Sequence, residues 1–482
     1  MGPQSHRAER PVVVKPGGLK SGAQTRRRHP SGSRSPDSAS PPVAGLAARK
    51  TAVRLLGAVI EASTSLDGLT DNEHGHPQYM ALEMRDRALV RAMLGAALRH
   101  RVTISALLAK RLDKPLPANA TALAHILHIA AAQILFLDVP DSAAVDLAVT
   151  HAKSDPRTQR FAGLVNAVLR ALCRAKATEL EPALANTHDA PEWFANRLVA
   201  AYGADEASAI LRAHRLEAPI DITVKSDPDL WAQRLGGIVL PTGSVRLEKL
   251  DGAITGLPGF DEGAWWVQDA AAALPARLMG DISGKKVADL CAAPGGKTAQ
   301  LIRAGADVTA VDASASRLKR LGRNLDRLGL KATIIHSDLM QLDPPDLFDA
   351  VLLDAPCSST GTVRRHPDVP WTKTPDDIAR LAALQRRLLD KAFTLIRDGG
   401  IVLFSNCSLD PSEGEELIAA FLADTPGAEQ DPIQPHEVPG IAPFVTPQGA
   451  LRTTPAGLDM GSPSLSGLDG FYAARLRKRA AS

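Results

Sequence analysis

The sequence predicts a multidomain chain: an all-α helical bundle, then a small α+β subdomain, then an α/β domain built on a parallel sheet. Apolar residues recur at three- and four-residue intervals from 49 to 174, which predicts the bundle. From 263 to 479, short apolar runs alternate with helical segments, which predicts parallel strands with helices on both faces. The length of 482 residues agrees with several domains, because it exceeds what one ordinary core holds.

The first 48 residues form a basic segment. Residues 1–50 hold ten Lys or Arg against two acids, a charge of +8, whereas the whole chain carries +3. The stretch RRRHPSGSRSPDSASPP (26–42) has almost no aliphatic side chains, so burial cannot offset its ordering entropy and we expect a disordered tail. The tail is either a solubilising extension or a loosely attracted partner of nucleic-acid phosphates.

Six segments of the bundle have helical apolar spacing, including TAVRLLGAVIEAS and TALAHILHIAAAQILFLDV, so we expect about six helices. Prolines fall between these segments, where helices can begin or end, at Pro115, Pro117, Pro140 and Pro156. The charged, Pro-containing stretch 175–191 is typical of a linker. After it, a helical segment and the strand-like runs IDITV and SVRLEKL predict the small α+β subdomain over 192–262.

Five apolar runs of the α/β domain read as buried strands: VADLC, VTAVDA, TIIHSD, AVLLDAP and IVLFSNCS. The first runs into VADLCAAPGGKTAQL (287–301), which is no phosphate loop of the GxxxxGK[ST] type because Cys291 stands where its first glycine belongs. The dinucleotide fingerprint GxGxxG is also missing. Gly295 and Gly296 still let a ligand approach the backbone, and the exposed amides at the start of the next helix favour a carboxylate.

Acids end the next three predicted strands, at Asp312, Asp338 and Asp354, where ligands of such sheets bind. Three carboxylates would repel a polyphosphate. They suit a ligand with hydroxyls, an amino-bearing base and a cationic centre, and S-adenosylmethionine has all three together with a carboxylate for the glycine turn. The plain alternative is that strand-end acids cap helices, but their ordered set favours this cofactor.

Two cysteines, Cys357 and Cys407, each follow a predicted strand end, so both thiols are expected to border one pocket. Methylation of an exocyclic amine needs no thiol, whereas carbon 5 of cytosine becomes nucleophilic only after a thiolate adds to carbon 6. Asp354 would assist near ring nitrogen 3 if it held a proton. The chemistry does not decide which thiol attacks. Cys173 and Cys291 are expected to pack, Cys291 with its backbone lining the cofactor.

The cysteines also bear on the class of protein. The four lie far apart without a CxxC pair, so neither a disulfide framework nor a zinc site is supported, and we expect no metal. Reduced thiols fit a cytoplasmic protein. No apolar run approaches the roughly 20 residues of a membrane helix, and no apolar core of a signal peptide follows the N-terminal arginines, so we expect neither membrane insertion nor export.

The motifs DLCAAPGGKT, DAPCSSTGTVRRHPDVPW and NCSLDPSEGEE together strongly resemble the RNA cytosine-5 methyltransferases of the NOL/NOP/Sun group. The helical region, with RDRALVRAMLGAALRH and FAGLVNAVLRAL, resembles the NusB-like RNA-binding domain that precedes the enzyme in bacterial small-subunit ribosomal RNA cytosine-5 methyltransferases. The resemblance covers residues from about 50 to 479. It implies S-adenosylmethionine-dependent methylation of one cytosine in 16S rRNA through a covalent adduct between a cysteine and carbon 6.

The resemblance also implies roles for individual residues. Cys407 corresponds to the nucleophile and Cys357 to the cysteine that assists product release, and Asn406 departs from the Thr that usually precedes the nucleophile. The residues matching the cofactor site are Cys291, Ala292, Ala293, Pro294, Gly295, Gly296, Lys297, Asp312, Asp338 and Asp354. Those expected to hold RNA phosphates are Arg364, Arg365 and His366, with Trp371 beneath the target nucleotide; a basic surface loop would explain the same residues.

Two other functions remain open. The same chemistry could act on transfer RNA, because the NusB-like region favours ribosomal RNA only by family association. Alternatively, the chain could be an RNA-binding assembly factor whose methyltransferase part is inactive, although the intact set of glycine turn, acids and thiols speaks against that. The partner that we expect for the chain is the ribosomal RNA of the small subunit.

Overall fold

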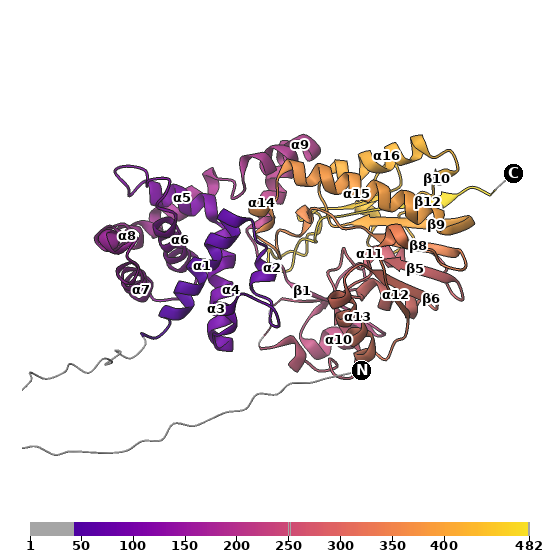
Figure 1. The fold of residues 1–482 in the computed structure, drawn as a ribbon, viewed down its shortest axis with the longest axis horizontal. Coiled ribbons are helices and arrows are strands. Elements are labelled where there is room, and N and C mark those ends of the chain that lie inside the picture. The colour runs from indigo at the N-terminus through magenta and orange to yellow at the C-terminus, as the bar shows by residue number, and fades with distance from the viewer. Residues whose placement is uncertain (1–42, 249, 251, 481–482) are drawn as a thin grey trace, which may run out of the picture. The chain divides into compact units, whose positions relative to one another are not determined.

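The computed structural model describes residues 43–248, 250 and 252–480 (Figure 1). The basic tail up to residue 42 lies outside the described residues, so its expected disorder stays a prediction. The first helix begins at Leu46, slightly before the expected start of the bundle at residue 49. In the described part of the chain, no helix has both the length and the apolar character needed to cross a membrane.

The N-terminal region is a helical bundle, as the sequence predicts. The six expected helices are all present, and two one-turn helices, α2 and α3, lie between the first pair. The eight are α1 (Leu46–Ala62), α2 (Leu66–Leu69), α3 (Pro77–Met80), α4 (Met84–Arg99), α5 (Arg101–Ala109), α6 (Thr121–Phe136), α7 (Asp141–Ser154) and α8 (Ala162–Asn186).

Helix α6 forms the centre of this bundle. Its sequence is apolar around its whole circumference, a pattern that places a helix inside a core rather than on a surface. Its side chains from Leu123 to Ile134 are almost all buried, and α1, α4, α5, α7 and α8 pack around it. The bundle therefore has its own hydrophobic core.

The expectation of a linker at 175–191 is wrong for most of these residues, because helix α8 continues to Asn186. Two features hold this helical extension. Leu180 and Ala183 pack on the core of the bundle, and Glu179 forms ion pairs with Lys110 and Arg111. Proline and charge in the sequence indicate a break, but these tertiary contacts outweigh that local signal.

The small α+β subdomain contains α9 (Glu192–His214), β1 (Ile220–Val224), α10 (Pro228–Leu235), β2 (Ile238–Val239), β3 (Val245–Leu247) and β4 (Trp265–Val267). Its strands form an antiparallel sheet in the order β2-β3-β1-β4. Strand β4 lies beyond the expected boundary at residue 262. The reason is that Trp265 is fully buried in the core of this sheet, a pairing that local sequence does not reveal.

The larger sheet has the order β10-β12-β9-β8-β5-β6-β7, with β11 paired to β12 (Figure 1). Five neighbouring strands run parallel, as predicted: β5 (Lys286–Leu290), β6 (Asp307–Asp312), β7 (Thr333–His336), β8 (Phe348–Asp354) and β9 (Ile396–Asn406). Three antiparallel strands complete it, namely β10 (Ala428–Gln430), β11 (Leu451–Thr453) and β12 (Phe471–Lys478).

Helices cover both faces of the larger sheet. One face packs against α15 (Pro375–Thr394) and α16 (Glu415–Asp424), and the other against α11 (Leu274–Arg277) and α12 (Gly296–Arg303). Helix α13 (Ala315–Arg327) packs beside α12, and the short α14 (Val369–Thr372) precedes α15. The parallel register aligns Leu290 with Leu353 and Asp354 with Ser405, so the loops after these strands meet at one edge.

Candidate active site

The glycine turn joins β5 to α12. Gly295 has φ 101°, and a Cβ atom there would lie 2.9 Å from Cγ of Leu321 on α13, so neither the backbone conformation nor the space admits a larger residue. Helix α12 begins at the next residue, Gly296, and its first amide groups have no partners within the helix. The turn thus presents backbone donors at the edge where the parallel strands end.

A cavity of about 330 Å³ lies against this turn, within the size range of small-molecule sites. The structure brings eight of the expected cofactor residues to its wall: Cys291, Ala292, Ala293, Pro294, Gly295, Gly296, Lys297 and Asp354. Sequence reasoning missed several others, including Trp266, Gln268, Asp269 and Asp289. The run WWVQDA carried the only signal for the first three, an apolar strand that ends in polar side chains.

Asp289 is the most unusual residue of this wall. It is fully buried in β5, and Oδ2 accepts a hydrogen bond from Thr298 Oγ1 at 2.6 Å. Its other oxygen, Oδ1, has no hydrogen-bond partner among the described residues. Burial raises the pKa of this carboxyl group to about 7. Its place in the site could not be predicted from the sequence, because Asp289 lies inside an apolar strand.

Two expected cofactor acids, Asp312 and Asp338, do not line the cavity. Asp312 is buried, and its carboxylate accepts hydrogen bonds from the amides of Ala293 and Ser314 and from Arg317, at 3.3, 2.8 and 2.8 Å. It therefore holds the glycine turn in place. Asp338 is exposed and caps a short 3-10 helix through the amide of Met340. Direct contact of either acid with a cofactor stays a prediction.

Lys297 and Asp354 connect the cavity to the following loops. Lys297 Nζ lies 2.8 Å from Asp354 Oδ2, and its ammonium group lies 4.9 Å from the centre of the Phe471 ring. The other oxygen of Asp354 accepts a hydrogen bond from Ser405 Oγ at 3.0 Å. Both carboxyl oxygens of Asp354 thus have partners inside the protein, and its assistance at ring nitrogen 3 stays a prediction.

The two cysteines that follow β8 and β9 lie together. Sγ of Cys357 is 3.4 Å from Sγ of Cys407, although the residues are fifty positions apart, and both are half-buried free thiols. Cys407 Sγ also lies 3.6 Å from Ser359 Oγ. The hydrogen bond between the thiols lowers the pKa of Cys407 and raises that of Cys357. When one thiol of the pair ionises, Cys407 is therefore the thiolate and Cys357 the donor.

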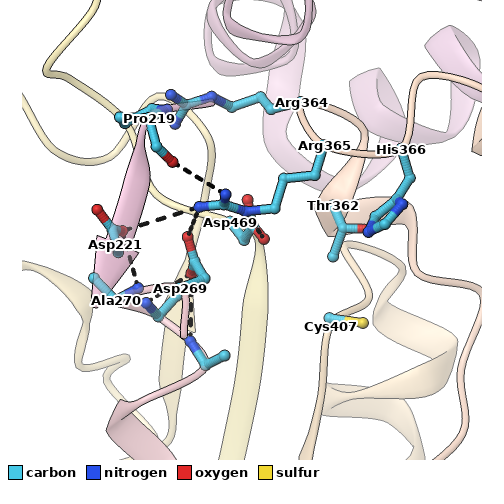
Figure 2. Close-up of polar contacts among 12 residues, drawn as sticks. Pro219, Asp221, Asp269, Ala270, Thr362, Arg364, Arg365, His366, Cys407 and Asp469 are labelled. Carbon is cyan, nitrogen blue, oxygen red and sulfur yellow. Dashed lines mark hydrogen bonds and ion pairs between the residues drawn. The ribbon is translucent and has the colours of Figure 1, made fainter. Parts of the chain in front are cut away.

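The expectation that Arg364 and Arg365 hold RNA phosphates is wrong in this structure. Arg364 is 1% exposed and donates to the backbone oxygen of Ser466. Figure 2 shows the Arg365 side chain extending toward aspartates rather than toward Cys407. Its guanidinium binds Asp269 at 2.7 Å and Asp469 at 3.0 Å, so its charge is already compensated inside the protein.

The rest of this loop faces the helical bundle. His366 Nδ1 forms an ion pair with Asp67 at 3.0 Å, and its side chain is about one third exposed, so a contact with RNA stays a prediction for this residue. Trp371 packs against the core of the bundle and donates to the backbone oxygen of Leu98, while Arg101 lies 5.6 Å from its ring centre. The expectation that Trp371 supports a target nucleotide is therefore wrong.

The fold and this site together define a methyltransferase-type α/β domain that follows a helical domain. Residues 279–477 match the family described as 16S rRNA methyltransferase RsmB/F, and residues 46–174 match the NusB family. The ribosomal RNA small subunit methyltransferase B of Pseudomonas syringae pv. tomato is 36% identical over 456 residues, covering 90% of this chain and 97% of that protein. The corresponding protein of Pasteurella multocida is 32% identical over 455 residues, with 90% and 96% covered. The chain belongs to this RsmB/F family of RNA methyltransferases.

Solved structures have the same fold. The crystal structure of PH0851 matches with a TM-score of 0.66 and 24% sequence identity, covering 90% of this chain and 98% of that one. A methyltransferase homolog protein from Pyrococcus horikoshii matches with a TM-score of 0.50 and 29% identity, covering 59% of this chain and 94% of its own. The described residues contain no cluster of three or more His, Cys, Asp or Glu side chains suited to a metal ion.

Proposed function

We propose that this protein transfers a methyl group from S-adenosylmethionine to carbon 5 of one cytosine in bacterial 16S rRNA. The observation that supports this reaction best is the pair of thiols 3.4 Å apart, at the edge of the sheet that also carries the glycine turn. Methylation of an amine or hydroxyl needs no such pair. Membership in the RsmB/F family supports RNA as the substrate, and the names of its relatives support the small ribosomal subunit.

The cavity fits the methyl donor in size and in polarity. The open amides at the start of α12 suit its carboxylate, and the unpartnered Oδ1 of Asp289 suits its ammonium group. The bound cofactor would supply an electrophilic methyl group. Lys297 and Asp354 border the cavity, and they also lie close enough to Cys407 for their charges to act on its thiol.

The chain's own groups account for the remaining steps. The thiolate of Cys407 would form a bond to carbon 6, and the electron pair of the double bond between carbons 5 and 6 would become available at carbon 5. Carbon 5 would then take the methyl group, while the donor sulfur keeps the electron pair of the bond that breaks. A base then takes the proton from carbon 5, the electrons re-form the ring double bond, and Cys407 leaves as a thiolate. We assign Cys357 to this release, because its sulfur lies 3.4 Å from that of Cys407.

We assign the helical region, residues 49–174, to RNA binding, and residues 263–479, together with the small subdomain before them, to catalysis. Ribosomal RNA as substrate implies the cytoplasm as the place of action. Transfer RNA is the second candidate substrate. The family names favour ribosomal RNA over it.

Labelled S-adenosylmethionine tests the proposal when it is incubated with the full chain and either unmodified 16S rRNA or unmodified transfer RNA. Label recovered as 5-methylcytosine in the ribosomal RNA is expected. Label in transfer RNA alone would support the second candidate, and retained RNA binding without any label would support a binding factor. A Cys173→Ala variant is the matched control, because Cys173 packs on the helical bundle.

A further inference from the structure

Glu413 is a buried acid close to the two thiols. It is fully buried at the end of a short 3-10 helix, Pro411–Glu413, yet it forms no ion pair within 4 Å among the described residues. Burying a carboxylate is costly unless hydrogen bonds replace its water. The position therefore requires donors from the surrounding protein.

Four hydrogen bonds replace that water. Oε1 accepts from the amide of Ser358 at 2.9 Å and from Gln385 Nε2 at 2.7 Å. Oε2 accepts from Ser408 Oγ at 2.6 Å and from the hydroxyl of Ser358. Ser358 directly follows Cys357, and Ser408 directly follows Cys407. One carboxylate thus bonds to the neighbours of both reactive thiols.

Further bonds connect the same two loops. Thr360 Oγ1 lies 3.0 Å from Ser408 Oγ and accepts from the amide of Leu409. Asn406 accepts from the amide of Ser408 and donates to the backbone oxygen of Glu413. Each of these groups is buried, so the loops cannot separate without leaving polar atoms unpaired.

We propose that Glu413 is a positioning residue: its carboxylate holds the two cysteine loops at their separation, and its negative charge directs ionisation to Cys407 rather than Cys357. This inference rests on the proposed function, since it concerns the thiols assigned there. The charge acts unequally because two of the four hydrogen bonds come from Ser358, next to Cys357, and only one from Ser408, next to Cys407. The charge of Glu413 raises the pKa of Cys357, whereas at Cys407 Lys297 lowers the pKa and Asp354 raises it. Cys357 therefore keeps its proton and donates a hydrogen bond to the thiolate of Cys407.

Site-resolved alkylation tests this proposal on the full chain without RNA or cofactor. Iodoacetamide would be applied across pH 6–9, and mass spectrometry would follow Cys357 and Cys407 separately. The wild type should react mainly at Cys407. Glu413→Gln removes the charge and should reduce the preference for Cys407 by about tenfold, the change that corresponds to one pKa unit. Glu416→Gln is the matched control, because this neighbouring acid is exposed.

A second variant separates charge from position. Glu413→Asp keeps the charge but shortens the side chain, so kcat of methyl transfer should fall while the preference for Cys407 persists. An unchanged alkylation pattern in Glu413→Gln would overturn the proposal, even if kcat fell. If Glu413→Gln does not fold, a wild-type kcat in Glu413→Asp would overturn it. A shifted preference in a protein that methylates no RNA would reject the proposed function and leave the role of Glu413 supported.

Discussion

Lys297 and Asp354 form an ion pair across the edge of the larger sheet, with Nζ and Oδ2 2.8 Å apart. Lys297 comes from the first turn of α12 and Asp354 from the end of β8, so the pair joins the glycine turn to the loop that carries Cys357. Each residue lines the cavity. The pair is therefore placed to hold the cofactor side and the thiol side of the site together.

Lys297→Met should weaken methyl transfer. The change leaves Asp354 without its cation and places a second uncompensated carboxylate beside Asp289. We expect kcat/KM for S-adenosylmethionine to fall by roughly 10- to 100-fold, the range of about 1–3 kcal/mol for a buried polar group that loses its partner. Steady-state kinetics would measure the loss. Lys286→Met, at a lysine on the surface, is the control, and equal kinetics in the two variants would contradict the role of the pair.

Arg365→Met should lower stability rather than RNA affinity. The guanidinium compensates Asp269 and Asp469, which are almost fully buried, and removing one partner of such a cluster costs about 3–5 kcal/mol. Urea unfolding would detect the loss as a lower midpoint. The salt dependence of RNA binding should stay unchanged, because a phosphate contact would reduce its slope by about one. A reduced slope with normal stability would restore Arg365 as an RNA contact.

The succession of the parallel strands along the chain could be read from the sequence because each contains an apolar run between helical segments. In β5 and β8 these runs are buried on both faces, whereas β7 at the edge of the sheet is largely exposed. The runs VADLC, TIIHSD and AVLLDAP lie within two residues of β5, β7 and β8. Strands β4, β10 and β11 have three residues each, too few for a period. They are strands because distant partners pair with them, as Trp265 does with Val224.

The site was predictable where one motif carries it and not where distant segments meet. The turn 291–297 is one contiguous segment, so its glycines are enough to predict it. Arg365 was misread because a sequence shows its charge but not the partners, and Asp269 and Asp469 lie 96 and 104 positions away. Glu413 was overlooked for the same reason, since its bonds to Ser358 and Gln385 form only in the fold.

Asp289 makes a specific prediction for the pH dependence of stability. Its pKa is about 7 in the folded chain, against about 3.9 in an unfolded chain, so the folded state binds the proton more tightly. Stability contributed by this proton is present below pH 4 and is lost as the pH rises to 7. Asp289→Asn should remove that part of the decline. Asp469, whose pKa burial likewise raises to about 7, contributes equally to both proteins and cancels in the comparison.

Urea midpoints of the wild type and Asp289→Asn at pH 5 and pH 8 would measure this difference. Between pH 5 and pH 8 only the two units from pH 5 to the folded pKa of about 7 count, so at 1.36 kcal/mol per pKa unit the difference is about 3 kcal/mol, and the variant should gain relative stability at pH 8. Asp281→Asn is a control on the surface of the same domain. A difference between wild type and Asp289→Asn that does not vary with pH would show that Asp289 is ionised in the folded protein.

Asn406 stands where the family resemblance implies a Thr, and the structure gives it three hydrogen bonds. Its amide nitrogen donates to Gln385 Oε1 at 3.1 Å and to the backbone oxygen of Glu413 at 2.6 Å, and its oxygen accepts from the amide of Ser408 at 2.9 Å. A Thr hydroxyl has one proton and cannot replace both donations. Asn406→Thr should therefore cost about 1–3 kcal/mol in urea unfolding. Full stability in this variant would mean that Gln385 repacks to take up the free bond.

The two thiols have different roles, so replacing each one should have a different effect on the covalent adduct between the enzyme and RNA. Cys407→Ala should reduce methyl transfer by more than about a thousandfold, because carbon 5 is not activated without the adduct at carbon 6. Cys357→Ala keeps the nucleophile but removes the neighbouring thiol 3.4 Å away, so the adduct should form and persist. Denaturing gel electrophoresis with labelled RNA would show a retarded band in Cys357→Ala alone, with Cys173→Ala as the unretarded control. A retarded band in Cys407→Ala would reverse the two roles, because the attacking sulfur would then be the one that remains.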